Sequence, residues 1–281
     1  MASLRDLVNL VRLPHSVFSL PFAAAAFLAA RGVPELRTLL WILACVVTAR
    51  TAAMAYNRWV DKDLDAANPR ASDREIPKGT VSPNQALALF ACAAVAFLFC
   101  ASRLNPICFA LSPMALAAVV LYSVSKRWTA LSHFLLGICL AMSPAGAWLA
   151  VRGTLEPAAL LLSGAVVLWL AGFDILYAIL DIEFDRGAGV RSIPAAVGER
   201  ASLWTARVCH LGSALLLLAV PLALPIGTGY IAAAGGFSLF LMAQHFWIGN
   251  ANRSRIASSV FVWNGWAALA FGIVVCFTAA A

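Results

Sequence analysis

Long apolar stretches, separated by short polar or Pro/Gly-containing breaks, make up almost all of the chain. A helix that crosses a membrane needs roughly 20 mostly apolar residues. We expect nine transmembrane helices. They lie near residues 16–30, 37–57, 84–101, 106–123, 130–151, 157–180, 203–222, 226–248 and 257–280.

Composition supports a membrane protein. Of the 281 residues, 62% are hydrophobic and 12% are charged, whereas soluble domains carry about 25% charged residues. No polar linker divides the apolar stretches, so we predict one all-α membrane domain over residues 1–281. The first stretch follows Arg5 and Arg12 and could be taken for a signal peptide. Because eight further stretches follow it, we expect it to be retained.

The basic residues of the short loops predict how the protein is oriented. If the N-terminus is cytoplasmic, the extracytoplasmic side receives only Arg31, Arg37, Arg103 and Arg152. The cytoplasmic side then receives Arg5, Arg12, Arg58, Lys62, Arg70, Arg74, Lys78, Lys126, Arg127, Arg186, Arg191, Arg200, Arg207, Arg253 and Arg255. We therefore predict a multi-pass protein of the cell inner (plasma) membrane with a cytoplasmic N-terminus.

The net charge of +7 is thus concentrated on one face. Such a face favours anionic lipid headgroups or an anionic substrate. Nucleic acid is not expected as a partner, because no soluble basic module is present to hold it. Nothing in the pattern indicates an oligomeric state.

Cysteine and histidine give little sign of chemistry. The seven cysteines lie in or at the ends of apolar stretches without CxxC spacing, so we expect small packing residues. The lone histidines His133, His210 and His245 are expected to be core residues rather than catalytic ones.

The acidic residues are strongly clustered. Nine of the thirteen lie at the ends of only two predicted helices, and they are Asp61, Asp63, Asp65, Asp73, Glu75, Asp174, Asp181, Glu183 and Asp185. Acids that served only solubility would be spread over the loops. Ionisable groups at such positions in a membrane protein indicate a functional site.

Helical spacing aligns each cluster. On a continuous helix, Asn57, Asp61 and Asp65 share one face, because they lie at i, i+4 and i+8. The second cluster repeats this arrangement at i, i+7 and i+11 with a tyrosine beside it, and consists of Asp174, Asp181, Asp185 and Tyr177.

Convergent carboxylates without partners repel one another, and a hard divalent cation such as Mg²⁺ relieves that repulsion. No histidine or cysteine accompanies them, which argues against zinc or iron. The alternative is that the acids are solvated or paired with nearby arginines. Matching spacing in two clusters favours the metal site.

Basic residues around the first cluster indicate an anionic ligand. Arg50 lies within the predicted helix, seven residues before Asn57 and on the same face. A buried arginine beside a metal site suits a diphosphate. Further basic residues in these loops are Arg58, Arg70, Arg74, Lys78, Lys126 and Arg127.

The two clusters also hint at an internal duplication. Each is followed by a basic loop that ends in Ile-Pro, over residues 74–77 and 191–194. A duplication predicts two helix groups that face each other across a central cavity.

At these residues the chain resembles the UbiA superfamily of intramembrane prenyltransferases. Four of the family's motifs occur in order: Asn-Asp-x-x-Asp-x-x-x-Asp, Arg-x-x-Pro-x-Gly, Tyr-x-x-x-Lys and Asp-x-x-x-Asp. Their counterparts here are Asn57, Asp61 and Asp65, then Arg74, Pro77 and Gly79, then Tyr122 and Lys126, and finally Asp181 and Asp185.

One position departs from the family pattern, because Arg58 stands where the first motif usually has aspartate. This removes a possible metal ligand and leaves Asp61 and Asp65 to form the first site. In this respect the chain is similar to 4-hydroxybenzoate-type polyprenyltransferases, including a subgroup assigned to the futalosine route to menaquinone.

The resemblance implies a Mg²⁺-dependent enzyme that transfers a polyprenyl group from a polyprenyl diphosphate to a small aromatic acceptor such as 4-hydroxybenzoate, in ubiquinone or menaquinone synthesis. The expected metal ligands are Asp61, Asp65, Asp181 and Asp185. These four aspartates and Asn57 are the expected catalytic residues. The expected substrate contacts are Arg50, Arg70, Arg74, Tyr122, Lys126, Asp174 and Tyr177.

Other readings stay open at this point. Within the superfamily, the acceptor could be a dihydroxynaphthoate, haem or a glycerol-phosphate lipid. A cation-coupled transporter is a further alternative, although its charges usually lie at the membrane midplane rather than at one face. A CDP-alcohol phosphotransferase would need an Asp-x-x-Asp-Gly motif, which this chain lacks.

Overall fold

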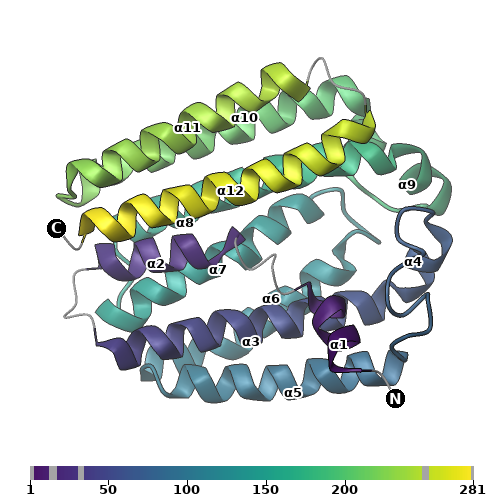
Figure 1. Ribbon diagram of the computed structural model, residues 1–281, viewed down its shortest axis with the longest axis horizontal. Helices are drawn as coiled ribbons and strands as arrows, with labels where there is room; N and C mark the ends of the chain where they lie inside the picture. Colours follow the sequence, from purple (N-terminus) through teal and green to yellow (C-terminus); the bar gives the residue numbers. More distant parts are fainter. Residues whose placement is uncertain (1–2, 13–17, 31–34, 249–252, 280–281) are drawn as a thin grey trace.

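The computed structural model describes residues 3–12, 18–30, 35–248 and 253–279, and this part of the chain is helical with no β-strand (Figure 1). The helices are α1 (Leu4–Val11), α2 (Leu20–Ala29), α3 (Leu36–Val60), α4 (Lys62–Ala67), α5 (Pro83–Ser102), α6 (Pro106–Ser125), α7 (Ser132–Arg152), α8 (Pro157–Ala178), the 3₁₀ turn η2 (Ile179–Asp181), α9 (Ile182–Ala188), α10 (Ile193–Ala223), α11 (Thr228–Ile248) and α12 (Arg253–Ala279).

The expected all-α membrane fold is confirmed, with one difference in the number of spans. Eight helical segments within the described residues are long and apolar enough to cross a membrane. The first of the nine expected stretches contains α2, which has only 10 residues. Such a helix is about 15 Å long, half the thickness of the hydrocarbon core. Residues 16 and 17 of that stretch lie outside the described residues.

Local sequence explains where the helices begin. Pro83, Pro106 and Pro157 each open a helix, where the missing N–H is not needed. Asn105 caps α6, since its Oδ1 accepts a hydrogen bond from the Cys108 N–H at 2.8 Å. Its Nδ2 donates to the Leu149 carbonyl at 2.8 Å, which attaches the start of α6 to the end of α7.

Helix α10 is two helical pieces rather than one. Gly198 has φ 81° and ψ 174°, a backbone conformation that favours glycine and interrupts the helix. The span expected at 203–222 therefore corresponds to the longer piece after this kink.

The core is centred on α8, the most buried of the spans. It packs against α7 and α10, while α3 packs against α5, and α2 against α7 and α12. Trp169 of α8 is fully buried, and its ring centroid lies 5.1 Å from those of both Phe22 and Phe237. Aromatic packing of this kind stabilises the contacts of α8 with α2 and α11.

A buried polar network also joins α8, α10, α11 and α12. Trp169 Nε1 donates to Asn264 Oδ1 at 2.8 Å, and Asn264 Nδ2 donates to Gln244 Oε1 at 2.9 Å. His210 Nδ1 lies 2.9 Å from His245 Nε2. The prediction that these two histidines are core residues is confirmed.

The two long helices that carry the acidic clusters end in the same way. α3 ends at Asp61 (φ −95°, ψ 4°), and η2, which extends α8, ends at Asp181 (φ −107°, ψ 9°). A short helix follows each bend, and α4 and α9 lie at the same end of the molecule, opposite the end of α12 (Figure 1). The acidic cluster at the end of α3 and the one at the end of α8 and η2 are thereby brought together.

Candidate active site

A cavity of about 230 Å³ lies between the acidic ends of the two long helices. Ten of the twelve predicted site residues line it: Asn57, Asp61, Asp65, Arg74, Tyr122, Lys126, Asp174, Tyr177, Asp181 and Asp185. The cavity therefore collects residues from both halves of the chain, as the spacing of the motifs led us to expect.

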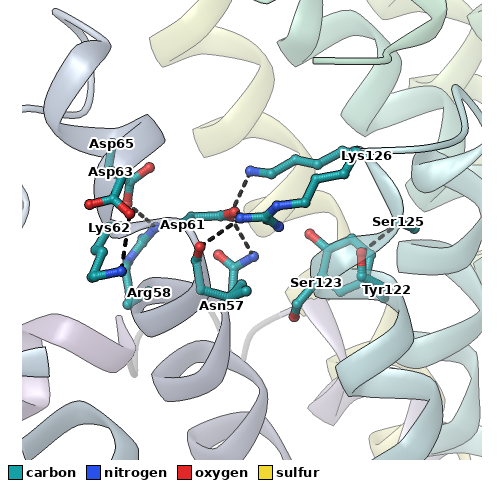
Figure 2. Close-up of polar contacts among 12 residues, drawn as sticks. Asn57, Arg58, Asp61, Lys62, Asp63, Asp65, Tyr122, Ser123, Ser125 and Lys126 are labelled. Carbon is teal, nitrogen blue, oxygen red and sulfur yellow. Dashed lines mark hydrogen bonds and ion pairs between the residues drawn. The ribbon is translucent and has the colours of Figure 1, made fainter. Parts of the chain in front are cut away.

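Asp61 is the most enclosed carboxylate of the cavity, with 1% of its surface exposed. Its Oδ2 accepts hydrogen bonds from Lys126 Nζ at 2.5 Å and from Asn57 Nδ2 at 3.0 Å. Figure 2 shows Lys126 reaching from the end of α6 toward Asp61. Burial raises the pKa of the Asp61 carboxyl above its ordinary value, although Lys126 and Arg127 oppose this. Cations near Asp61 therefore favour its ionised form.

Asp65 is held between two arginines. Arg74 Nη1 donates to Asp65 Oδ1 at 2.5 Å, and Arg58 Nη1 lies 3.9 Å from Asp65 Oδ2. Arg58, the residue that departs from the family pattern, is 7% exposed and lines the cavity. It therefore adds a fixed positive charge to the first acidic cluster.

The loop after α4 connects the first half to the second acidic cluster. Arg70 Nη1 lies 2.6 Å from Asp181 Oδ2, and Asn68 Nδ2 donates to Asp181 Oδ1 at 3.4 Å. The Arg70 guanidinium also lies 5.1 Å from the centroid of the Tyr177 ring, a cation–π geometry. Arg70 does not line the cavity, but it contacts two residues that do.

Asp185 is held from the start of the following helix. Its Oδ2 accepts a hydrogen bond from Ser192 Oγ at 2.7 Å, and the same hydroxyl accepts one from the Ala195 N–H at 3.2 Å. Ser192 thus caps α10 and orients Asp185 at the same time. The sequence analysis missed Ser192, although a serine followed by Ile-Pro is a signal for a helix start.

His133 is the other residue that the sequence analysis missed. It lines the cavity, and its Nδ1 lies 2.7 Å from Asp174 Oδ2. It is buried as expected, at 3% exposure, but it lies beside the site rather than in an inert core. No local spacing could reveal the pair, because its members are 41 positions apart on α7 and α8.

Comparison with known proteins decides the family. The sequence profile of the UbiA prenyltransferase family matches residues 18–266. This chain belongs to the UbiA prenyltransferase family. It is therefore a prenyltransferase, rather than a cation-coupled transporter or a CDP-alcohol phosphotransferase.

Two bacterial proteins illustrate the relatives of this UbiA family member. It is 32% identical over 248 residues to the 4-hydroxybenzoate octaprenyltransferase of Vibrio cholerae serotype O1, covering 84% of this chain and 85% of that protein. It is 31% identical over 278 residues to the 4-hydroxybenzoate octaprenyltransferase of Pseudomonas syringae pv. syringae, covering 96% of this chain and 92% of that protein.

Solved UbiA structures share the fold. A UbiA homolog from Aeropyrum pernix K1 matches with a TM-score of 0.87 at 32% identity, over 95% of this chain and 98% of that one. A UbiA homolog from Archaeoglobus fulgidus, solved bound to DMAPP and Mg²⁺, matches with a TM-score of 0.76 at 19% identity, over 96% and 98% of the two chains.

The predicted metal ligands of this UbiA chain have side-chain partners, the arrangement that the sequence left open as an alternative. Each of the four predicted metal ligands lies beside a basic or hydroxyl side chain, because the connecting loops fold back over the cavity. Within the described residues, no three His, Cys, Asp or Glu side chains are grouped closely enough to hold a metal ion.

The donor set nevertheless fits a hard cation. Asp61 Oδ1 and Asp65 Oδ2 are buried, and neither accepts a hydrogen bond from the described residues. Carboxylate oxygens with free lone pairs are the ligands that Mg²⁺ prefers. Asp61 and Asp65 could therefore hold a divalent ion, with Asp181 and Asp185 across the cavity as the second pair.

Arg50 differs from the other predicted contacts. It does not line the cavity, and its Nε is buried without a hydrogen-bond partner among the described residues. Its role in substrate binding stays a prediction.

Proposed function

We propose that this enzyme transfers a polyprenyl group from a polyprenyl diphosphate to a small aromatic acceptor such as 4-hydroxybenzoate, in a Mg²⁺-dependent step of ubiquinone or menaquinone biosynthesis. One observation carries the proposal: a single cavity at the end of the spans is lined by five carboxylates together with several cationic side chains. The names of the bacterial relatives support the acceptor, and the ligands of the Archaeoglobus fulgidus homolog support the donor and the metal.

Asp61 and Asp65 would hold one Mg²⁺, and Asp181 and Asp185 a second. When bound, Mg²⁺ supplies positive charge that stabilises the departing diphosphate. The unbonded oxygens of Asp61 and Asp65 support this assignment of the first site.

The basic residues would bind the rest of the diphosphate. Lys126, Arg70 and Arg74 now pair with Asp61, Asp181 and Asp65, so their charged ends already lie among the expected metal ligands. An arginine can hold two phosphate oxygens at once. As the carbon–oxygen bond of the donor breaks, these cations stabilise the charge that gathers on the leaving group.

The remaining residues would face the reacting carbon and the acceptor. Asn57, Tyr122, Tyr177 and Asp174 line the same cavity. A volume of about 230 Å³ is below the usual range for a whole ligand site, roughly 300–1,000 Å³. A long isoprenoid tail therefore has to extend beyond the cavity, and the apolar surroundings suit it.

The enzyme would lie in the cell inner (plasma) membrane with this cavity facing the cytoplasm. The loops that carry Arg70, Arg74, Lys126 and Arg191 all meet at the cavity end of the molecule. An excess of Lys and Arg marks the cytoplasmic side of membrane proteins. Cysteine labelling from outside intact cells tests this: a single cysteine placed at Lys78 should be protected, and one at Arg103 should react.

A product assay tests the proposed reaction. The purified protein is given Mg²⁺, polyprenyl diphosphates of several lengths and a panel of acceptors containing 4-hydroxybenzoate, a dihydroxynaphthoate and glycerol phosphate. Mass spectrometry identifies the prenylated product. A prenylated aromatic acid is the expected result, whereas prenylation of glycerol phosphate alone would overturn the aromatic acceptor.

A further inference from the structure

His133, which is buried, and Asp174, which is partly exposed, form a pair whose function the proposed reaction does not yet explain. His133 Nδ1 lies 2.7 Å from Asp174 Oδ2, within the range of a charge-assisted hydrogen bond. The His133 side chain is 4% exposed, whereas that of Asp174 is 28% exposed. The carboxylate therefore opens to the cavity, and the imidazole lies behind it.

The backbone determines which nitrogen of His133 carries the proton. The Ile193 N–H donates to His133 Nε2 at 3.3 Å, so Nε2 is an acceptor and is unprotonated. Nδ1 must then carry the hydrogen of the neutral ring, which it donates to Asp174. A neutral donor holds the carboxylate in place without neutralising its charge, so Asp174 keeps the capacity to accept a proton.

Asp174 is also separated from the diphosphate side of the cavity. It lies in α8, seven residues before Asp181, which is about 10 Å along a helix. Asn57, Tyr122 and Tyr177 line the same cavity. An aromatic ring placed there would lie next to the reacting carbon of a donor whose diphosphate is bound by Lys126 and Arg70, the partners of Asp61 and Asp181.

We propose that Asp174, positioned by His133, accepts a hydrogen bond from the hydroxyl group of a phenolic acceptor and takes up its proton during prenyl transfer. This inference rests on the proposed function. It narrows the class of acceptor to aromatic compounds that carry a hydroxyl group on the ring. Asp174 is the catalytic residue, because it would touch the substrate, and His133 is a positioning residue.

The carbon–oxygen bond of the donor breaks, and its electron pair leaves with the diphosphate. The ring carbon ortho to the hydroxyl forms the new carbon–carbon bond while the O–H proton passes to Asp174, giving a dienone. Asp174 returns that proton to the oxygen as the ring C–H proton is lost to water. The ring is again aromatic, and one proton is released per turnover.

The test compares acceptors that differ in hydroxyl acidity. Wild type and Asp174→Asn are assayed with 4-hydroxybenzoate and with 3-fluoro-4-hydroxybenzoate, whose hydroxyl is more acidic and which keeps one ortho position open. Removal of a general base costs about 10²- to 10⁴-fold in kcat. We expect such a loss with 4-hydroxybenzoate and a clearly smaller loss with the fluorinated acceptor. Because each variant is compared with wild type on the same acceptor, the lower nucleophilicity of the fluorinated ring cancels.

A pair of His133 variants separates positioning from packing. The amide N–H of His133→Asn can replace Nδ1–H toward Asp174, whereas His133→Leu keeps the volume but has no donor. We expect His133→Asn to retain activity within about tenfold of wild type. His133→Leu should show the same dependence on acceptor acidity as Asp174→Asn, with the donor KM unchanged. His245→Asn is the matched control, a buried histidine outside the cavity, and should not change the ratio between acceptors.

The outcomes distinguish a failure of the proposed function from a failure of the roles given to Asp174 and His133. If wild type prenylates no phenolic acceptor, the proposed function fails. If wild type does so but Asp174→Asn loses the same factor with both acceptors, the role of Asp174 is wrong. If His133→Asn and His133→Leu lose equal activity, His133 only fills space. Should Asp174→Asn fail to fold, the acceptor ratio of the His133 pair decides the question.

Discussion

Lys126 Nζ and Asp61 Oδ2 are 2.5 Å apart, although the two residues are separated by 65 positions in the chain. This contact joins the end of α6 to the end of α3 at the wall of the cavity. A lysine so placed can turn from the carboxylate to a phosphate oxygen without leaving the site.

Lys126→Ala should therefore weaken use of the donor more than use of the acceptor. We expect the donor KM to rise about tenfold, the loss of one charge-assisted contact, while the acceptor KM changes little. Steady-state kinetics with each substrate varied in turn measures this. Lys62→Ala is the matched control, because Lys62 is partly exposed and pairs with Asp63. An unchanged donor KM in Lys126→Ala would contradict the assignment.

The four predicted metal ligands should each be essential. Asp61→Ala, Asp65→Ala, Asp181→Ala and Asp185→Ala are expected to abolish measurable turnover while the protein stays folded in the membrane. Asp63→Ala should remain active, because the Asp63 side chain is 87% exposed and lies outside the cavity. Substantial activity in any two of the four variants would rule out the two-metal assignment.

Removal of divalent cations should stop the reaction. We expect EDTA to abolish product formation and added Mg²⁺ to restore it, whereas Ca²⁺ should restore little, because it is larger and prefers more ligands. Asp65→Asn should need more Mg²⁺ for half-maximal activity than wild type does. Full activity in EDTA would contradict a metal-dependent mechanism.

Arg70 should hold its loop against the second half of the molecule. It contacts both Asp181 and Tyr177, at 2.6 Å and 5.1 Å. In Arg70→Ala we expect faster proteolysis of the segment 68–82 and a higher donor KM. Arg70→Lys should restore part of the donor affinity but not the stacking on Tyr177. Equal protease resistance in wild type and Arg70→Ala would show that this contact does not hold the loop.

Asn264 should contribute to stability and not to chemistry. Asn264→Leu removes the acceptor for Trp169 Nε1 and the donor for Gln244 Oε1, both buried. The expected loss is about 1–2 kcal/mol of unfolding free energy, measured as a lower Tm in detergent. Activity per folded molecule should not change. If Tm stays the same, the network does not hold these helices together.

Much of this protein could be predicted from the order of its residues alone. Apolar runs long enough to cross a membrane determine helices, because a lipid environment leaves the backbone few other ways to satisfy its hydrogen bonds. Helical periodicity places Asn57, Asp61 and Asp65 toward one cavity despite the bend at Asp61. These are local properties, and a single sequence contains them.

Only the tertiary structure decided which side chains meet. The contacts of Lys126 with Asp61, of Arg70 with Asp181 and of His133 with Asp174 join positions far apart in the chain. The tertiary structure also decided the position of Arg50. Its helical face was predicted from the sequence, but Arg50 does not line the cavity. Hydropathy and periodicity determine the face of a helix, but the packing of one helix on another determines what that face contacts.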